Sequence, residues 1–297
     1  MEFIGYEEGS PVYLRFLELP SATPFHTLSW LRFVRTILPG SKIRFLVWHE
    51  GGYPSGIMPI VERRFLFVRA GYSVPFDAPG GPLGSPAPRD WHKPLSDYWR
   101  VRICDPEGVL TSPWSLIRVP VHLIDTARFS PSRSQIKATR QAERRGLSLE
   151  RISGFSEEIY GLYCKVKAIK GGLRFGLRAM EALFTEMSGH ILGFIARHEG
   201  RAVAFILNFF HNQRAVSYLH GFDREFAGLR PMSALIMRSV ESARDMGITE
   251  FSLGSTTPGD KGQAAFKESF GAVPKPMNIH IKRGIFEMIP KRRDRTL

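Results

Sequence analysis

The sequence predicts a mixed α+β fold with two tandem domains, each a mostly antiparallel twisted sheet that contains one parallel strand–helix–strand crossover. Three observations support this prediction. The chain has 297 residues, about twice the length of a common domain. A hairpin pattern occurs twice, about half a chain apart, and the second half orders its strands and helices in a way that requires a parallel crossover.

The repeated pattern is His-Glu-Gly between two alternating apolar segments. FLVWHEGGYPSGIMPI begins at Phe45 and FIARHEGRAVAFILNF at Phe194, a separation of 149 residues. Period-two alternation on both sides of a glycine is typical of a β-hairpin, in which Gly51 and Gly200 allow the tight turn. We therefore expect equivalent hairpins in the two halves.

Around the second hairpin, two helices and three strands are expected at 156–169, 178–187, 191–198, 201–210 and 214–222. The next segment, LRPMSALIMRSVESARDMG, has apolar residues at helical spacing, with Pro231 in its first turn and Gly247 as its stop, and a strand follows at 248–253. Such a strand–helix–strand unit forms a parallel crossover, and its ligands bind at the C-terminal ends of the strands.

In the first half, a helix and two strands are expected at 26–36, 42–49 and 54–61. The segment VPFDAPGGPLGSPAP (74–88) is too rich in turn formers for regular structure. The predicted organisation is a domain at 1–130, a basic connecting helix at 131–150 and a second domain at 151–297, which is expected to hold the functional site.

The connecting helix, SRSQIKATRQAERRG, is expected to begin after a serine cap and to end at Gly146. Its cations are spaced three or four residues apart and form one stripe, with little apolar surface: Arg133, Lys137, Arg140 and Arg144. Two interpretations stay open. The stripe binds phosphates, with Arg140 and Arg144 among its contacts, or the helix is a solvated link.

The composition is globular, with 43% hydrophobic residues, and the formal net charge of +13 favours an anionic partner. Nucleic acid, a phosphorylated cofactor and an anionic membrane surface all fit. The basic tail at 291–295 is a candidate for contact with phosphates or lipid headgroups, or is simply solvated.

Several common sites are absent from the sequence: it has no GxxxxGK[ST], GxGxxG, HExxH, CxxC or GxSxG motif. Two cysteines and scattered histidines give no metal-ligand spacing, so no metal is expected. The N-terminus is unlike a signal peptide, and no apolar run approaches the roughly 20 residues of a spanning helix. We expect a cytoplasmic protein, with peripheral contact at the inner face of the membrane as a further expectation.

A series of short motifs in the second half reads HEGRAVAF, YLHGFD, LRPMSALIMRSVESARDMG, FSLGS and GDKGQAAFKESFGA. In the first half, TPFHTLSWLRF, VPFDAPGGPL and RQAERRGLSLE occupy comparable places. Together these segments, over about 12–273, resemble the tandem GNAT acyltransferases of the FemAB type. The resemblance implies two GNAT-fold domains and transfer of an acyl or aminoacyl group to an amine, on peptidoglycan precursors in the best-known members.

The resemblance also implies an activated donor, aminoacyl-tRNA or an acyl thioester such as acyl-CoA, and no permanently bound cofactor. Acyl-CoA relatives carry a Q/RxxGxG/A loop ahead of the central helix. Here REFAGLRPM (224–232) has Gly228 but lacks the second glycine. The charge of +13 favours tRNA as the donor.

Acyl transfer needs cations and N–H donors, because negative charge develops on the carbonyl oxygen and on the leaving group. In FSLGSTTPGDKGQAAFKESFGA (251–272), Phe266 and Phe270 are expected to face the core at i and i+4. Lys267 would then lie on the rim of the cleft, and the family's FK..FG ending points to the same residue. We expect Lys267 to stabilise the departing group; the alternative is a solvent-facing helix lysine.

On the strand 214–222, period-two alternation places Val216, Tyr218, His220 and Phe222 on one face. Tyr218 is expected to offer a hydroxyl to the substrate and His220 to act as general base, the alternative being that both residues pack in the fold.

Five further residues are expected to bind substrate or cofactor. Arg224 and Arg230 bracket the start of the central helix, where N–H groups and the helix dipole favour an anion. Ser255 and Thr256 follow a strand end and can donate hydroxyl groups, although a turn would recruit the same residues. Phe266 would line the cleft.

Two classes of function stay open. The first is an N-acyltransferase that modifies an amine, on a peptidoglycan or other cell-envelope precursor, with the basic stripe holding tRNA, CoA or a pyrophosphate-linked precursor. The second is a catalytically inactive, basic GNAT-fold module that binds RNA or an anionic membrane. The lack of aromatic residues near the stripe disfavours single-strand binding.

Overall fold

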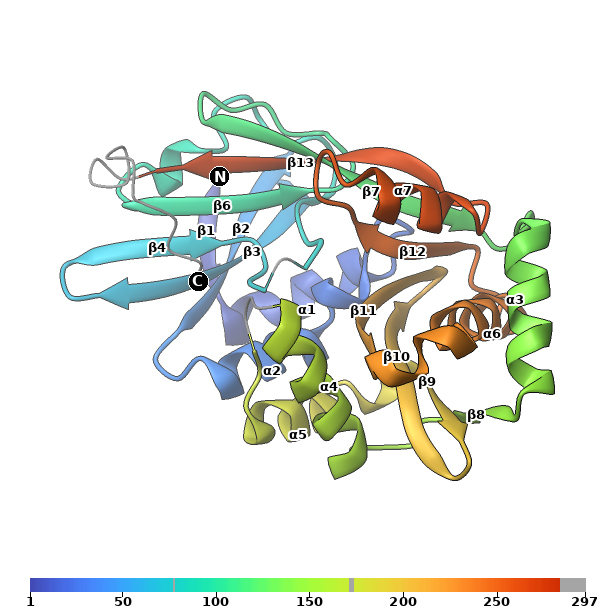
Figure 1. The fold of residues 1–297 in the computed structure, drawn as a ribbon. Helices are drawn as coiled ribbons and strands as arrows, with labels where there is room; N and C mark the ends of the chain where they lie inside the picture. Colours follow the sequence, from blue (N-terminus) through green and yellow to red (C-terminus); the bar gives the residue numbers. More distant parts are fainter. Residues whose placement is uncertain (77, 171–173, 284–297) are drawn as a thin grey trace. The chain divides into compact units, whose positions relative to one another are not determined.

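In the computed structural model, residues 1–76, 78–170 and 174–283 are described (Figure 1). They form two compact units: Met1–Val119 with the segment that begins at Pro276, and Pro120–Lys275. The basic tail at 291–295 lies outside the described residues. The expected domain boundaries at 130 and 150 stay a prediction.

The first unit is built on a sheet with the strand order β1-β2-β3-β4-β6-β13. All recorded neighbours are antiparallel except β4 and β6, which are parallel. Its strands are β1 (Glu2–Gly5), β2 (Lys42–Glu50), β3 (Tyr53–Phe65), β4 (Val68–Tyr72), β5 (Leu83–Gly84), β6 (Arg100–Asp105) and β13 (Val273–Lys282), and its helices are α1 (Tyr6–Leu17) and α2 (Leu28–Ile37). The segment 74–88 is almost entirely irregular, as its composition predicts.

The second unit has the strand order β7-β12-β11-β10-β9-β8. Its strands are β7 (Ser115–Asp125), β8 (Leu147–Arg151), β9 (Ile191–His198), β10 (Arg201–His211), β11 (Arg214–Phe222) and β12 (Glu250–Ser255). Its helices are α3 (Arg133–Arg144), α4 (Glu157–Lys170), α5 (Leu177–Glu186), α6 (Pro231–Asp245) and α7 (Lys261–Glu268), and a 3₁₀ segment, η4, spans Arg224–Leu229.

Both predicted hairpins are present. The β2–β3 turn consists of Gly51 and Gly52, and the β9–β10 turn of Glu199 and Gly200; all four residues have positive φ. This is the backbone that a two-residue turn needs to match the twist of its strands. The predicted crossover is also confirmed, because β11 and β12 are parallel and α6 connects them. The mixed, mostly antiparallel fold is therefore the one that the sequence predicts.

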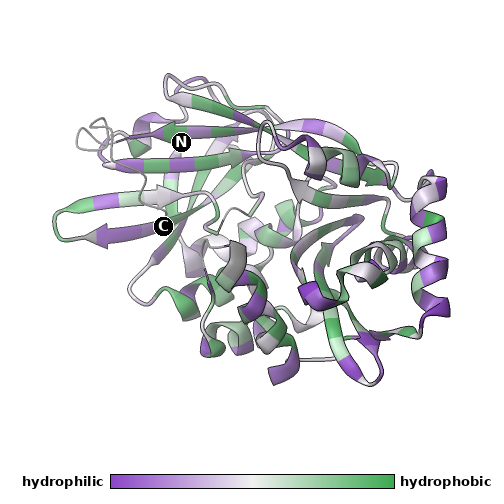
Figure 2. Ribbon diagram, in the orientation of Figure 1, coloured by the Kyte–Doolittle hydropathy of each residue, from purple (hydrophilic) through white to green (hydrophobic). Residues whose placement is uncertain are grey.

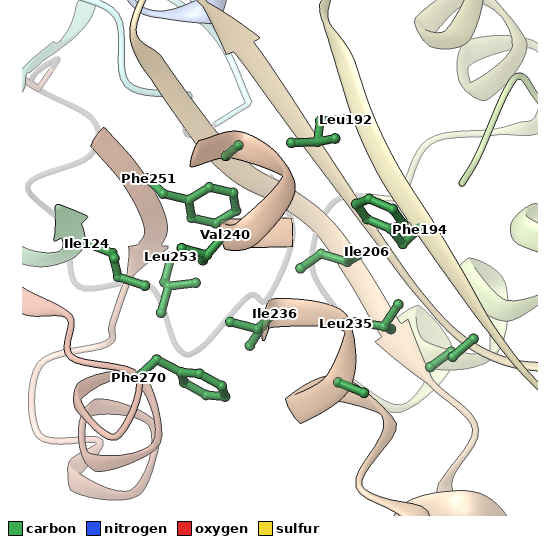
Figure 3. Packing of buried hydrophobic residues seen from close by; sticks show 14 of the residues in the cluster. Ile124, Leu192, Phe194, Ile206, Leu235, Ile236, Val240, Phe251, Leu253 and Phe270 are labelled. Atoms are coloured by element: carbon green, nitrogen blue, oxygen red, sulfur yellow. The ribbon is translucent and has the colours of Figure 1, made fainter. Parts of the chain in front are cut away.

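The core of the second unit lies between α6 and the sheet (Figure 3). Leu235, Ile236 and Val240 of α6 meet Ile206 of β10 and Phe251 of β12, and all five are nearly or fully buried. Because α6 is anchored along its apolar face, its N-terminus is held in a fixed place above the ends of the strands.

Helix α3 differs from the expectation in one respect. Its serine cap is confirmed, since Ser132 accepts a hydrogen bond from the backbone N–H of Gln135. The predicted lack of a packing face is wrong: Gln135, Ala138 and Ala142 are buried, and α3 packs against α6. Small side chains make this face weakly apolar, so α3 appears in Figure 2 as a mostly hydrophilic helix with paler bands. The basic stripe lies on the rest of its surface.

Phe270 and Phe266 give a matched test of this core. Phe270 is fully buried, whereas Phe266 is 37% exposed. Phe270→Ala is expected to lower the free energy of unfolding by about 3 to 5 kcal/mol, because it leaves a cavity in the core. Phe266→Ala should cause a much smaller loss, and urea denaturation of both variants measures the two values. Equal losses would contradict the packing described above.

Candidate active site

The second unit contains a cavity of about 450 Å³ at the place where β11 and β12 stop pairing. The two strands are paired only at Arg214 to Val216 with Glu250 to Ser252. Beyond these residues, the cavity is lined by Leu253 of β12 and by four residues of β11: Ser217, His220, Gly221 and Phe222. The open end of a parallel pair is where α/β folds bind their ligands. The cavity therefore lies where the sequence predicts a ligand site, and ligand binding there stays a prediction.

A β-bulge in β11 decides which side chains of that strand reach the cavity. Leu207 is opposite Leu219 and Asn208 is opposite Ser217, so Tyr218 is the extra residue of β11 at this shift in register. The extra residue interrupts the alternation, so the single face expected for Val216, Tyr218, His220 and Phe222 is not formed. Ser217, His220 and Phe222 line the cavity, whereas the Tyr218 ring lies 5.5 Å from that of Phe209.

Helix α4 forms one wall of the cavity, through Val166, and packs close to β11. A Cβ atom on Gly221 would lie 2.4 Å from Cγ2 of Val166, so only glycine allows α4 to approach this strand. Asp223, just after β11, accepts hydrogen bonds from Nζ of Lys165 on α4 and from the guanidinium of Arg201 on β10, each at 3.0 Å. The hydrogen bond from Lys165 is the main reason that the Asp223 pKa is lowered. This carboxylate therefore fixes α4 against the strand end.

The N-terminus of α6 forms the opposite wall. Arg230 is its N-cap, with φ 52° and ψ 47°, and Pro231 is its first residue. Arg230 stands two residues after Gly228, at the place of the second glycine in the Q/RxxGxG/A pattern described above, and it adopts the left-handed conformation that glycine favours. Arg224 of η4 and Arg230 both line the cavity. This wall therefore combines two arginines with the positive end of a helix dipole.

Lys267 lies in the wall formed by α7, but its setting differs from the one predicted. The side chain is buried, with 7% exposure, and Nζ donates hydrogen bonds to the carbonyl oxygens of Gly254 at 3.0 Å and Ser255 at 2.8 Å. Helix α7 ends at Glu268, just before Phe270; the rings of Phe266 and Phe270 are still in contact, with centroids 5.2 Å apart, but only Phe270 is buried. Phe266 is therefore the partly exposed residue, and Lys267 the buried one.

A second bulge supplies those carbonyl groups. In the pairing of β12 with β7, Ser252 is opposite Leu123 and Ser255 is opposite Val121, so two residues of β12 face His122 alone. The irregular ladder leaves carbonyl groups of β12 available to Lys267. Burial lowers the pKa of Lys267 from 10.5 to about 8, while Asp260 opposes this shift. At neutral pH the ammonium is thus retained, but it loses its proton far more easily than a solvated lysine.

His122 is a buried neighbour of Lys267 that the sequence does not single out. Its Nδ1 lies 3.2 Å from Oγ1 of Thr256, and its Nε2 lies 3.6 Å from Oε1 of Glu268. Burial lowers the pKa of His122, and the charge of Lys267 lowers it further. A lone histidine inside a strand gives no sequence signal for such a place, because the contact depends on the bulge opposite.

Gln135 of α3 is a second lining residue without a sequence signal. Its amide nitrogen donates to Oγ of Ser269 at 2.8 Å. Its Oε1 is buried and has no hydrogen-bond partner in the part of the chain that the structure describes. An unsatisfied buried acceptor is unfavourable in the free protein, so Gln135 offers the cavity an acceptor for a ligand N–H or O–H group.

The predicted site residues thus fall into two groups. His220, Arg224, Arg230, Phe266 and Lys267 line one cavity. Those outside its lining are Tyr218, Ser255, Thr256, Arg140 and Arg144. The carbonyl oxygen of Ser255 accepts a hydrogen bond from Lys267, and the hydroxyl group of Thr256 contacts His122. Arg140 and Arg144 line a separate, shallow hollow along α3, together with Arg133 and Lys137.

The cavity lining has cations but, among the described residues, no Asp or Glu side chain. Apolar residues make up much of the remainder: Val166, Ile206, Phe222, Met232, Ile236 and Leu253.

Within residues 1–76, 78–170 and 174–283, no group of three or more His, Cys, Asp or Glu side chains is placed to hold a metal ion. In the same ranges, no helix is both long and apolar enough to cross a membrane.

Comparison with known proteins gives one family match. Residues 133–268 match the family model of the acetyltransferase (GNAT) domain, a range that contains the cavity lining from α3 to α7. Among curated proteins, the sequence has no significant match.

Three solved structures are similar to this chain in fold. FemX has 11% sequence identity and a TM-score of 0.66, over 94% of this chain and 97% of FemX. A tandem GNAT protein from the clavulanic acid biosynthesis pathway has 13% identity and a TM-score of 0.59, over 95% and 98%. The C-terminal domain of a protein assigned as a lysylphosphatidylglycerol synthetase from Agrobacterium fabrum has 15% identity and a TM-score of 0.57, over 85% and 86%.

The lowered pKa of Lys267 predicts how stability depends on pH. Between about pH 8 and 10.5, the unfolded chain binds a proton at this lysine that the folded chain has lost. The free energy of unfolding should therefore rise with pH in this window, relative to Lys267→Met, which has no such proton. Below pH 8 both states are protonated, and the difference between the two proteins should be constant. Urea denaturation at several pH values measures it; a difference that stays constant up to pH 10.5 would contradict the lowered pKa.

Proposed function

We propose that the chain is an acyltransferase and that the cavity of the second unit is its active site, because residues 133–268 match the GNAT domain model and the chain shares its fold with FemX and a tandem GNAT protein. There it transfers an acyl or aminoacyl group from an activated donor to an amine. One observation carries the proposal: a single cavity joins the N-terminus of α6, with Arg224 and Arg230, to the buried ammonium of Lys267.

The reaction forms one bond and breaks one. The neutral nitrogen of the acceptor attacks the donor carbonyl carbon, and the C–N bond forms as negative charge develops on the carbonyl oxygen. The tetrahedral intermediate then expels a thiolate or an alkoxide, and the nitrogen loses one proton. The products are an amide and a protonated leaving group. The protein must therefore stabilise negative charge twice and accept one proton.

Lys267 is suited to stabilising that charge. An ammonium group has three N–H donors, and the carbonyl groups of Gly254 and Ser255 accept from two of them. The two bonds hold the group in place before the reaction, so no reorganisation is needed when charge develops nearby. Burial also strengthens the interaction, because little water screens it. Lys267 would act as a fixed cation that stabilises the oxyanion or the leaving group.

His220 is the group proposed to accept the proton. It lies in the cavity lining on β11, two residues after the bulged Tyr218, and imidazole is a side chain that can act as a general base near neutral pH. Tyr218 is not part of this proposal, since the bulge takes it out of the cavity lining.

The lining favours an anionic donor that carries an uncharged acyl group. Arg224, Arg230 and the N-terminus of α6 would bind a phosphate of the donor, whether this belongs to CoA or to the 3′ end of a tRNA. The apolar lining would accept the acyl chain. A cationic side chain, such as that of a lysyl group, would find no carboxylate among the lining residues that the structure describes.

The acceptor is proposed to be an amine on a cell-envelope precursor. The similarity of fold to FemX and to a protein assigned as a lysylphosphatidylglycerol synthetase supports this choice, as does the basic stripe on α3. Arg140 and Arg144 would hold phosphate groups of the precursor or of tRNA, contacts that weaken steeply as salt rises.

The function is tested by incubating the purified chain with each donor and an acceptor, and by measuring the amide product by mass spectrometry. Acetyl-CoA, a long-chain acyl-CoA and aminoacyl-tRNA serve as donors, and a UDP-linked muropeptide as the acceptor. Turnover with one donor, accompanied by a rise in melting temperature with that donor alone, would support the proposal. Binding of RNA or of vesicles without turnover of any donor would favour the inactive binding module instead.

Lys267→Met is expected to lower turnover by about 10²- to 10³-fold, as loss of one oxyanion donor does elsewhere. In the parent protein, turnover should fall as pH rises through about 8, because Lys267 then loses its charge. In Lys267→Met, the remaining turnover should not fall in this pH range. Lys261→Met is the matched control, since Lys261 is an exposed lysine on the same helix. Equal activity in parent and Lys267→Met would remove Lys267 from the mechanism.

Arg230→Gly removes the guanidinium, and glycine adopts the left-handed backbone of this position without strain. If Arg230 binds a donor phosphate, KM for the donor should rise about tenfold or more, since hydrogen bonds to charged groups are among the stronger ones. The melting temperature should not fall. An unchanged or lower KM would show that the backbone of this loop, rather than the Arg230 side chain, meets the donor.

A further inference from the structure

The β3–β4 hairpin of the first unit has an apolar tip in solvent. Leu66 is 94% exposed and Phe67 100%, and together they form the two-residue turn that follows the last pair of the ladder, Phe65 with Val68. Val68 itself is 38% exposed. Scattered single apolar residues are normal on a surface, but a contiguous group at the end of a hairpin is characteristic of a binding surface.

The tip extends past its neighbours in the sheet of the first unit. Pairing of β3 with β2 ends at Glu62, and pairing of β4 with β6 begins at Ala70. The segment between them is a two-stranded ribbon, which Figure 1 shows as a narrow hairpin. In Figure 2 the end of this hairpin is hydrophobic and a hydrophilic stretch of strand lies next to it. The apolar group is therefore presented at an end, separate from the core of its own unit.

The turn itself does not explain these residues. Leu66 has φ 52°, a left-handed conformation that is unusual for a bulky side chain. A two-residue hairpin turn in which the first residue has positive φ and the second does not is most stable with glycine first, and the β2–β3 hairpin of the same unit has glycine at both positions, Gly51 and Gly52. Leu-Phe at this position disfavours the turn and exposes apolar surface to water. Both effects are unfavourable for the isolated protein, which points to a partner that covers the tip.

Cations surround the base of the tip. Arg64 and Arg69 are directly opposite each other in the ladder, an arrangement of like charges that is unfavourable by itself. Arg64 contacts Glu62 at 3.2 Å and Arg69 contacts Asp97 at 3.5 Å, so each is partly compensated. Arg63 adds a further positive charge between Glu62 and the tip. Within 62–69, three arginines outnumber one glutamate.

We propose that this hairpin is a membrane contact: Leu66 and Phe67 enter the interfacial layer of an anionic phospholipid bilayer, and the arginines behind them bind lipid phosphate groups. An apolar end followed by basic residues matches the order of layers that a bilayer presents, acyl chains beneath a sheet of negative headgroups. The backbone of the tip stays in the hydrated headgroup region, where its N–H and C=O groups can bind water. This contact does not depend on the proposed transfer reaction.

A bilayer fits the tip better than RNA does. A single-stranded RNA is bound by aromatic rings on which successive bases stack, and this turn offers one ring beside an aliphatic side chain. A protein groove would also accept an apolar tip, but it would not require cations on both strands behind it. The vesicle experiment below separates these partners.

The test is sedimentation of the full chain with vesicles of phosphatidylglycerol and phosphatidylcholine in equal parts, compared with vesicles of phosphatidylcholine alone. The double variant Leu66→Gly, Phe67→Ser gives the turn glycine where φ is positive and a polar residue after it, so its melting temperature should stay the same or rise. Its partition onto the anionic vesicles should fall by about tenfold or more, since two large apolar side chains no longer leave water. Arg64→Gln should weaken partition onto anionic vesicles and leave the weak partition onto neutral vesicles unchanged.

Tyr53→Ser is the matched control, because Tyr53 is a 79% exposed aromatic residue beside the turn of the β2–β3 hairpin. It should bind vesicles like the parent. The proposal is overturned if the parent does not bind anionic vesicles, or if the double variant binds them as well as the parent, since the membrane contact would then run through other basic surfaces. If the double variant loses the binding to RNA that the parent shows, but binds vesicles like the parent, the tip contacts RNA and the proposal is overturned.

Discussion

The hydrogen bonds from Lys267 to the carbonyl groups of Gly254 and Ser255 are the interaction on which the proposed active site depends. They make it possible to bury an ammonium group beside a cavity, because two of its donors are satisfied by strand backbone. They also connect α7 to the end of β12. The lowered pKa of Lys267 follows from the same burial, so a single structural feature gives this site its position, its charge and its sensitivity to pH.

Two irregularities in the sheet create this setting. The bulge in β12 opposite His122 leaves carbonyl groups available to Lys267, and the bulge at Tyr218 turns Ser217 and His220 toward the cavity. A regular ladder would pair the carbonyl groups and would keep Tyr218 on the face of His220. Bulges next to functional sites redirect side chains in this way. The apolar face of α6 then fixes the helix N-terminus, so that the arginines and the lysine meet at one cavity.

The sequence predicted well what depends on local pattern. The alternation of apolar residues around glycines predicted both hairpins. The helical spacing of apolar residues between Pro231 and Gly247 predicted α6 and its parallel crossover. What it missed depends on contacts between distant segments. A bulge is a mismatch between two strands, so no local pattern in either strand shows it. For that reason, Lys267 was expected on the rim and is buried, and His122 gave no signal at all. The β3–β4 hairpin was missed because RRFLFVR has no turn-forming residue.

The most direct measurement of the central claim is the titration of Lys267 itself, by NMR of the ¹³C-labelled ε-methylene group, with Lys267→Met to assign the signal. In the free protein, Lys267 should titrate near pH 8. A phosphonate analogue of the tetrahedral intermediate should raise that value, because a negative charge beside the ammonium favours its protonated form. A lysine that titrates near 10.5 in the free protein, and that does not respond to the analogue, would contradict the account of this site.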